Sequence, residues 1–396
     1  MKKKLLPALI VTGLIILVVI IMGITALINK YTPTKKTEDL KEYFNISSDD
    51  EAALIVDNEL SDYKAKIIDK KIYVDYKFVH DSLNSRFYWD ANENVLLYTT
   101  ASDIISAAAD SNSYSVTKQT NDFGYPIVKA TSDSALIALD YVKQYSNITF
   151  KSYDDPARIV ITSKWDEIDS ATVSKSTQVR VKGGIKSPIL KEVKKDDKIT
   201  ILDSGDKWDK VATEDGVIGY IKRKALSESK KTKLTNPDYE EETFTHIKKD
   251  KDICLAWNQV TSQSANSKVP QVISSTKGIN VMSPTWFYLN DNNGNLADIA
   301  SKDYVSYCHS QGIEVWGLFS NFENTDVDAA YVLTHTSTRT TLINQIMSAA
   351  FNYELDGVNI DFENITEAAY GDSYIEFIRE LAIKSVSYTH LRAHET

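Results

Sequence analysis

A run of 24 residues near the N-terminus contains no charged side chain, and it restricts the possible structure of the chain more than any other segment does. The run extends from Leu5 to Ile28 and follows three lysines, Lys2 to Lys4. As an α-helix it would be about 36 Å long, at roughly 1.5 Å per residue, which is enough to cross a hydrocarbon core about 30 Å thick. A cleaved signal peptide is the alternative, but its apolar core usually has only about 7–15 residues. We therefore expect residues 5–28 to form a transmembrane helix in the lipid bilayer.

The lysines beside the apolar run bear on the orientation of the chain. Those at the N-terminus favour a cytoplasmic N-terminus, because basic residues tend to stay on the cytoplasmic side of a membrane. That preference is weakened by three lysines on the far side, Lys30, Lys35 and Lys36. We expect residues 1–4 to be a cytoplasmic tail, residues 29–39 to be a linker, and the bulk of the chain to be extracellular.

The composition narrows the classes of function. A net charge of −10 and a pI near 5.2 argue against a nucleic-acid partner, since proteins of that class usually present a basic face. The chain has two cysteines, Cys254 and Cys308, so it is no disulfide scaffold, and we expect both thiols to be buried. No spacing of ligand-type residues predicts a cofactor or a metal site.

Residues 40–165 contain a diverged internal repeat with an offset of 63 to 64 residues. The first copy contains the segments Tyr76–Val79, Phe87–Asp90 and Val95–Thr99. The second copy contains the segments Asp140–Val142, Phe150–Asp154 and Ile159–Thr162. Each copy predicts a short helix, a strand, a tight polar turn and a second strand, and hence an α+β repeat domain. The region resembles the amino-terminal-like domain of copper amine oxidases. Without a histidine cluster this resemblance implies no copper, and we expect a spacer or wall-contact role.

Residues 168–228 change in character to short β-type runs separated by Gly and Asp turns. The runs are Thr177–Val181, Lys198–Leu202, Trp208–Ala212 and Ile218–Ile221. Many short strands in so short a segment predict a small β-barrel. The stretch from Gly205 to Ile221 resembles a bacterial SH3-type domain, a family that often binds cell-wall peptides or glycans. Trp208 is then either a ligand platform or a core residue. We expect residues 229–246 to be a linker.

Strands and helices alternate from about residue 247 to residue 384. The predicted strands are Ile253–Val260, Gly278–Leu289, Gly312–Phe322 and Leu355–Glu363. The predicted helices are Asp298–Gly312, Ser337–Tyr353 and Ser373–Ile383. Alternation of this kind indicates a parallel sheet covered by helices. Active residues in such folds lie at the carboxyl ends of the strands.

The fourth of these strands carries an unusual line of polar side chains. Because side chains alternate between the two faces of a strand, three of them share one face: Asn359, Asp361 and Glu363. The opposite face is apolar and consists of Val358, Ile360 and Phe362. A line of inward-facing carboxylates is costly to bury without a function. Asp356 has the opposite parity to Glu363, so we expect it to act at the start of the strand.

The octapeptide from Asp356 to Glu363 resembles the signature of glycoside hydrolase family 18, the chitinase-like enzymes: Asp-x-x-Asp-x-Asp-x-Glu, here with Asn359 at the second Asp. The resemblance extends to Ser283–Phe287 and Ser320–Phe322, and covers about 250–384. It implies a (β/α)₈ TIM barrel. Members related to bacterial spore and cell-wall N-acetylglucosaminidases are similar to this variant.

The resemblance also implies a mechanism. Glu363 would protonate the glycosidic oxygen, while the 2-acetamido oxygen of the substrate, in place of a protein nucleophile, attacks the anomeric carbon. Asp361 would orient that acetamido group and raise the pKa of Glu363. Asn359 would keep a hydrogen-bonding partner for Asp361. The expected substrate-binding residues are Trp257, Trp286, Asn321 and Phe322; for the three aromatic residues, core packing is the alternative.

The barrel region is short for its family. A complete barrel usually needs about 250 residues, so residues 247–384 should supply about the first four βα units. Residues 385–396 read as a non-native tail. The sequence as a whole predicts a multidomain α/β protein: a membrane-anchored extracellular glycosidase of N-acetylglucosamine-containing glycans, either peptidoglycan or chitin. The alternative is a non-catalytic protein that binds cell-wall glycan.

Overall fold

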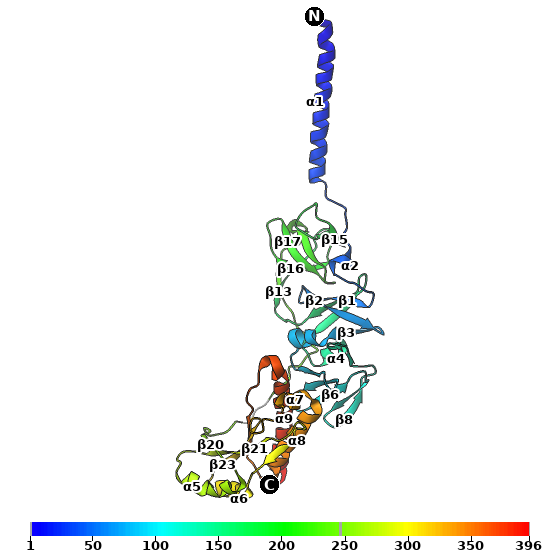
Figure 1. Cartoon of the computed structure of the whole chain (residues 1–396). Helices are drawn as coiled ribbons and strands as arrows, with labels where there is room; N and C mark the ends of the chain where they lie inside the picture. The colour runs from blue at the N-terminus through cyan, green and yellow to red at the C-terminus, as the bar shows by residue number, and fades with distance from the viewer. Residues whose placement is uncertain (1, 245–247, 396) are drawn as a thin grey trace. The chain divides into compact units, whose positions relative to one another are not determined.

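The computed structural model describes residues 2–244 and 248–395 (Figure 1). Residues 1, 245–247 and 396 lie outside the described residues. Residue 1 belongs to the predicted cytoplasmic tail, residues 245 and 246 to the predicted linker, residue 247 to the barrel region, and residue 396 to the non-native tail. The chain forms two compact units. Unit 1 comprises Met1–Val74 and Lys143–Tyr239, and unit 2 comprises Asp75–Val142 and Glu240–Thr396. The fold is a mixed α/β fold with several separate sheets.

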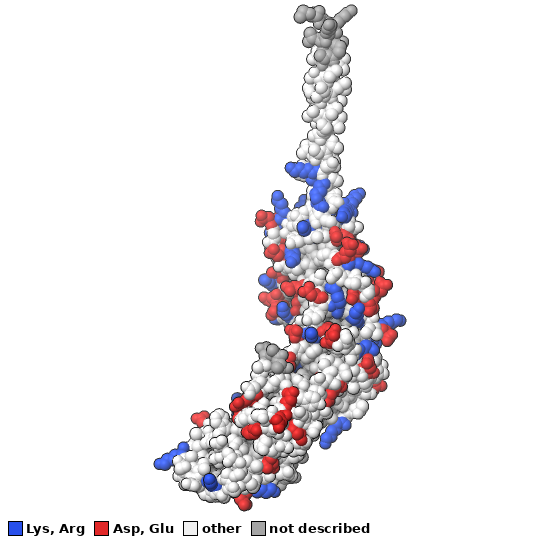
Figure 2. All heavy atoms as spheres, viewed as in Figure 1, with Lys and Arg blue, Asp and Glu red and all other residues white. Residues whose placement is uncertain are grey.

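Unit 1 begins with the apolar helix α1 (Lys2–Tyr31). Its segment Leu9–Tyr31 is long and apolar enough to cross a membrane, a property shared by anchors and signal sequences. Figure 2 shows no charged residue on the visible surface of α1 between its grey N-terminal atoms and the lysines at its far end. The segment predicted as a linker is hydrogen-bonded to the rest of unit 1 at residues 34–38. There, backbone N–H groups of Thr34 and Glu38 donate to the carbonyl oxygens of Ile185 and Ile189, both at 2.8 Å.

The first sheet strands of unit 1 lie in the order β11, β12, β1, β2, β3. Their bounds are β1 Glu51–Val56, β2 Glu59–Ile68, β3 Lys71–Asp75, β11 Thr149–Tyr153 and β12 Arg158–Thr162. The short helix α2 (Leu40–Tyr43) precedes β1, and the short helix α4 (Leu139–Gln144) precedes β11 and contains the boundary between unit 2 and unit 1 in the sequence. Helix α4, β11 and β12 confirm the pattern predicted for the second copy of the repeat. Strands β1 and β12 pair in parallel, whereas β1–β2, β2–β3 and β11–β12 are antiparallel.

The second sheet of unit 1 has seven strands in the order β15, β14, β18, β17, β16, β13, β19. Four of them confirm predicted strands: β14 Thr177–Arg180, β16 Lys198–Asp203, β17 Trp208–Thr213 and β18 Ile218–Lys222. Three were not predicted: β13 Glu167–Thr172, β15 Ile189–Val193 and β19 Lys230–Lys233. Strand β19 lies within the range predicted as a linker. Gly219 is required where β18 pairs with β14, because a Cβ there would lie 2.6 Å from the Arg180 carbonyl oxygen.

Unit 2 contains an antiparallel meander that begins after a short helical segment. The strands are β4 Phe87–Asp90, β5 Val95–Thr99, β6 Ile104–Ala108, β7 Ser113–Val116 and β8 Gln119–Asp122. The helical segment is α3 (Tyr76–Phe78), continued by the π-helix η1 (Val79–Leu83). The hairpin β9 (Val128–Ala130) and β10 (Ala135–Ala138) follows the meander. Helix α3, β4 and β5 confirm the pattern predicted for the first copy of the repeat.

The remainder of unit 2 is a sheet whose strands run in the order β20, β21, β23, β24, all parallel. Their bounds are β20 Leu255–Asn258, β21 Val281–Leu289, β23 Glu314–Ser320 and β24 Gly357–Asp361. The four predicted strands are thus confirmed, with shorter bounds. A short strand, β22 (Leu296–Asp298), pairs antiparallel with β21 and was not predicted.

Helices follow each parallel strand. They are η3 Gln263–Lys268, α5 Val269–Ser274, α6 Lys302–Ser310, α7 Ala329–Thr334, α8 Thr336–Asn352 and α9 Glu367–Glu395. Three of them confirm predicted helices, namely α6, α8 and the middle of α9. One buried apolar cluster joins the strands to these helices and includes the completely buried Phe319, Leu342 and Phe377. Cys308 lies buried there, but Cys254 is exposed, so the expectation of two buried thiols was wrong for Cys254. The reason is its position before β20, outside this cluster.

Candidate active site

The site residues come from the end of β24. This strand pairs with β23 so that Leu318 lies opposite Asn359 and Ser320 lies opposite Asp361. Its alternate residues Val358, Ile360 and Phe362 pack against the apolar cluster of unit 2. The alternation of an extended strand then turns Asn359, Asp361 and Glu363 to the other face. Asn359 and Asp361 are half-buried, and Glu363 is exposed just beyond the last paired residue.

The backbone of Glu363 is held from the neighbouring strand. Its N–H donates to Asn321 Oδ1 at 2.8 Å, and Asn321 Nδ2 donates to the Glu363 carbonyl oxygen at 3.0 Å. Asn321 follows directly after β23, so its side chain continues the contact between β23 and β24 beyond the backbone ladder. The Glu363 carboxyl group is left facing solvent, where it could meet a ligand.

Asn359 and Asp361 have different neighbours. The Asn359 amide nitrogen donates to Ser283 Oγ at 3.1 Å, which links β24 across β23 to β21. Ser283 is completely buried. Burial, together with the nearby Asp361 carboxylate, raises the pKa of Tyr374 on α9. Asn359 is thus hydrogen-bonded to Ser283 on β21, and its expected role as a partner of Asp361 stays a prediction.

Asp356 lies at the opposite end of the strand from Glu363. Its Oδ2 accepts from the Val315 N–H at 2.8 Å and lies 2.8 Å from His309 Nε2. These contacts join helix α6, β23 and the start of β24. Seven residue steps separate Asp356 from Glu363, or roughly 23 Å along an extended strand. The structure therefore places Asp356 at the start of the strand, as expected from its parity, and does not bring it to the strand end.

The aromatic candidates separate into two groups. Trp257 is 71% exposed at the end of β20, and Phe322 is 41% exposed just after β23. Trp257 thus lies in the carboxyl half of a parallel strand and Phe322 lies just beyond one, as Glu363 does. Trp286 is completely buried: its indole N–H donates to Asn266 Oδ1 at 2.8 Å, and its ring meets Tyr304 edge-on at 4.9 Å. The placement of Trp286 corresponds to the core-packing alternative.

Two further polar residues at this edge were not predicted. Ser320 is completely buried, and its hydroxyl lies 2.5 Å from Glu323 Oε2 and 3.3 Å from the Phe287 carbonyl oxygen. Glu323 thus adds another carboxylate beyond the end of β23. The only signal in the sequence is that Glu323 directly follows the predicted strand end Ser320–Phe322, which is too weak to single it out.

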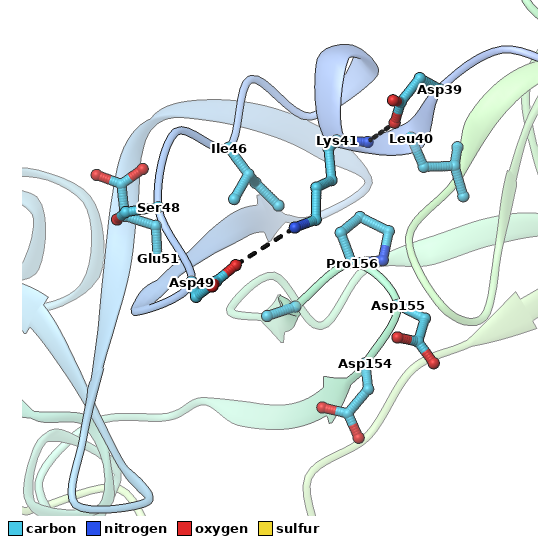
Figure 3. A pocket seen from close by; sticks show the side chains of 11 residues that line it. Asp39, Leu40, Lys41, Ile46, Ser48, Asp49, Glu51, Asp154, Asp155 and Pro156 are labelled. Atoms are coloured by element: carbon cyan, nitrogen blue, oxygen red, sulfur yellow. Dashed lines mark hydrogen bonds and ion pairs between the residues drawn. The ribbon is translucent and has the colours of Figure 1, made fainter.

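Unit 1 contains a separate cavity of about 480 Å³. Its lining includes the carboxylate side chains of Asp39, Asp49, Glu51, Asp154 and Asp155 (Figure 3). Lys41 Nζ lies 3.3 Å from Asp49 Oδ1. The backbone N–H of Lys41 also donates to Asp39 Oδ1 at 2.7 Å. Among the residues that line this cavity is none of the predicted site residues, so it is distinct from the end of β24.

Comparison with known proteins gives matches to solved structures only. No family model matches the sequence, and no curated protein matches it. The C-terminal domain of a candidate chitinase from Desulfitobacterium hafniense is 22% identical, with 34% of this chain and 43% of that chain covered and a TM-score of 0.30. The spore cortex-lytic enzyme SleL from Bacillus cereus is 16% identical, with 38% and 36% covered and a TM-score of 0.29.

A chitinase from Chromobacterium violaceum is 17% identical, with 33% of this chain and 40% of that chain covered and a TM-score of 0.27. The chain thus spans less than half the length of each of these structures.

Proposed function

We propose that the protein is a glycoside hydrolase that cleaves glycans containing N-acetylglucosamine, with Glu363 as its general acid. The observation that carries this proposal is the end of β24. An exposed glutamate lies there two residues after a half-buried aspartate on the same strand face, at the carboxyl edge of a parallel sheet. The sequence around it resembles the family 18 signature, and Trp257 and Phe322 offer exposed rings at the same edge.

The proposed reaction uses the substrate's own acetamido group. Glu363 donates its proton to the glycosidic oxygen while the acetamido oxygen attacks the anomeric carbon, so the bond to the leaving sugar breaks as an oxazolinium ring forms. Asp361 orients the acetamido group and stabilises its developing positive charge. Water then opens the ring, with the Glu363 carboxylate taking the proton from water. The substrate glycan is peptidoglycan or chitin. The reaction needs no metal or cofactor.

The other parts of the chain fit an enzyme that works outside the cell. We propose that α1 anchors the chain in the membrane with a cytoplasmic N-terminus. Residues 40–165, the repeat region, then act as a spacer, and residues 168–228 act as an SH3-type domain that contacts the cell wall. In this proposal, 247–384 is part of a (β/α)₈ barrel.

The test is sugar release by the wild-type chain and a Glu363→Gln variant, with purified peptidoglycan and chitin oligosaccharides as substrates. Loss of a general acid should lower kcat by about 10²- to 10⁴-fold, while binding of the oligosaccharide persists. The matched control is Glu354→Gln. Glu354 is also an exposed glutamate, and it lies before β24 rather than after it.

Three outcomes are informative. Loss of turnover in Glu363→Gln with normal turnover in Glu354→Gln supports the proposal. Equal turnover by wild type and Glu363→Gln removes Glu363 from its role. Glycan binding without any turnover by the wild-type chain favours the alternative, a non-catalytic cell-wall glycan-binding protein.

A further inference from the structure

We propose that Asn321 is a positioning residue that fixes the backbone of the general acid Glu363, rather than a residue that binds the sugar. The inference rests on the proposed function of Glu363. It starts from the two hydrogen bonds between the Asn321 amide and the Glu363 backbone, at 2.8 Å and 3.0 Å. Both the oxygen and the nitrogen of the amide are used by these bonds, so the group is oriented toward the strand.

The position of Asn321 in the sheet explains why a side chain is needed there. Backbone pairing between β23 and β24 ends at Ser320 opposite Asp361. Glu363 lies two residues beyond that pair, and the next residue, Asn364, has a positive φ of 61° that turns the chain away from the sheet. The side-chain amide of an asparagine presents N–H donors next to a carbonyl acceptor, the same kinds of group that a neighbouring strand would offer. Asn321 therefore extends the ladder by one step with its side chain.

The surroundings of Glu363 make this contact important. The residue is exposed and lies between the end of β24 and the start of α9, so less packing holds it than holds Ile360. General acid catalysis requires the carboxyl group to lie within hydrogen-bond reach of the leaving oxygen. A displacement of about 1 Å can lower a rate by about 10²-fold. A clamp on the Glu363 backbone is thus a direct way to fix the acid.

The experiment compares wild type, Asn321→Ala, Asn321→Asp and the control Asn324→Ala in the full chain. Asn324 suits as a control because it is also half-buried, lies in the same loop and donates to a carbonyl oxygen, that of Asn290 at 2.8 Å. Asn321→Asp keeps the acceptor for the Glu363 N–H and loses the donor, so it should fall between wild type and Asn321→Ala. Hydrogen exchange at the Glu363 amide reports the clamp, and exchange at Ile360 reports whether β24 is still folded.

For Asn321→Ala we expect exchange at Glu363 to be about tenfold faster, the effect of one lost hydrogen bond. With chitin oligosaccharides, kcat should fall about 10- to 100-fold with KM within about twofold of wild type. Asn324→Ala should match wild type in both measurements.

The outcomes separate the two proposals. A wild-type chain without turnover refutes the proposed function, whatever the exchange data show. An active wild type with unchanged kcat in Asn321→Ala refutes the positioning role. A raised KM at unchanged kcat also refutes it and returns Asn321 to sugar binding. If hydrogen exchange at the Ile360 amide is also faster in Asn321→Ala, β24 itself is perturbed in that variant. The kcat and KM of Asn321→Asp are then compared with those of wild type by the same criteria.

Discussion

The two buried glutamates on α9, Glu376 and Glu380, differ in their hydrogen-bond partners. Glu380 is paired with the buried Arg339, whose Nε lies 2.9 Å from Glu380 Oε1. Glu376 is also completely buried, but its Oε1 has no hydrogen-bond partner among the described residues. Burial, helped by the charge of Glu380 and opposed by Arg379 and Arg339, raises the pKa of Glu376 to about 7. Ionisation of Glu376 therefore makes the free energy of unfolding depend on pH.

The sign of that dependence follows from the direction of the shift. The pKa of Glu376 in the folded state lies above its ordinary value of 4.5. Below pH 4.5 both states hold the proton and the folded state bears no penalty. As the pH rises from 4.5 to 7 the unfolded state ionises first, so stability is lost through this window, by roughly 3 kcal/mol at most.

We predict that Glu376→Gln removes this loss, because the neutral amide resembles the protonated acid. The measurement is the free energy of unfolding of unit 2 from urea titrations at pH 5 and pH 8, in the full chain. Wild type should lose on the order of 2–3 kcal/mol more than the variant between the two pH values. Glu354→Gln, at an exposed position, should behave as wild type. Parallel pH profiles for wild type and Glu376→Gln would contradict the assignment.

At the scale of elements, the sequence pattern was most informative where one face of an element is buried. The strand at the end of which Glu363 lies was predicted because its apolar and polar residues alternate, and its apolar residues do pack in the core. By contrast, all four residues of β19 are exposed, so no hydrophobic pattern marks it. Strand β22 is only three residues long, too short for any periodicity.

Side-chain contacts across strands were not predictable from the sequence. The alternation of β24 says which face Asn359 shares, but the bond to Ser283 depends on the order β21, β23, β24 and on the register of the pairs. The same holds for Asn321. The family resemblance implied that Asn321 binds the sugar, whereas its side chain is hydrogen-bonded to the Glu363 backbone. Trp286 was ambiguous because an aromatic residue in a strand can face either the core or a cleft.

For the whole molecule, the two copies of the repeat have similar elements but belong to different units. Strands β4 and β5 lie in unit 2, and β11 and β12 lie in unit 1. Within unit 2 the meander packs on the helices of the other sheet. Tyr88 Oη lies 2.9 Å from Ser373 Oγ, and Asp90 Oδ2 accepts from the N–H of Thr336 at 2.6 Å. Local pattern predicted the elements of each copy, whereas their partners depend on contacts distant in sequence.

The proposed membrane attachment is also tested on the whole chain. We predict that the full chain stays with membranes through an alkaline carbonate wash, and that a chain beginning at Thr32 is released, because the 23 residues of the candidate span supply the apolar surface. The mass of the mature protein should include the N-terminal lysines. A mature protein that begins after Ile28 would show instead that α1 is a cleaved signal sequence.

In the proposed reaction, Glu363 delivers a proton to a glycosidic bond while the substrate's acetamido oxygen attacks. The decisive experiment compares the rate of hydrolysis of an N-acetylglucosamine oligosaccharide with that of the same oligosaccharide after complete removal of its acetyl groups. We expect hydrolysis of the acetylated sugar, and a rate at least about 10³-fold lower for the deacetylated sugar, because the intramolecular nucleophile is missing. Equal rates for the two sugars, or hydrolysis of only the deacetylated one, would refute the proposed reaction.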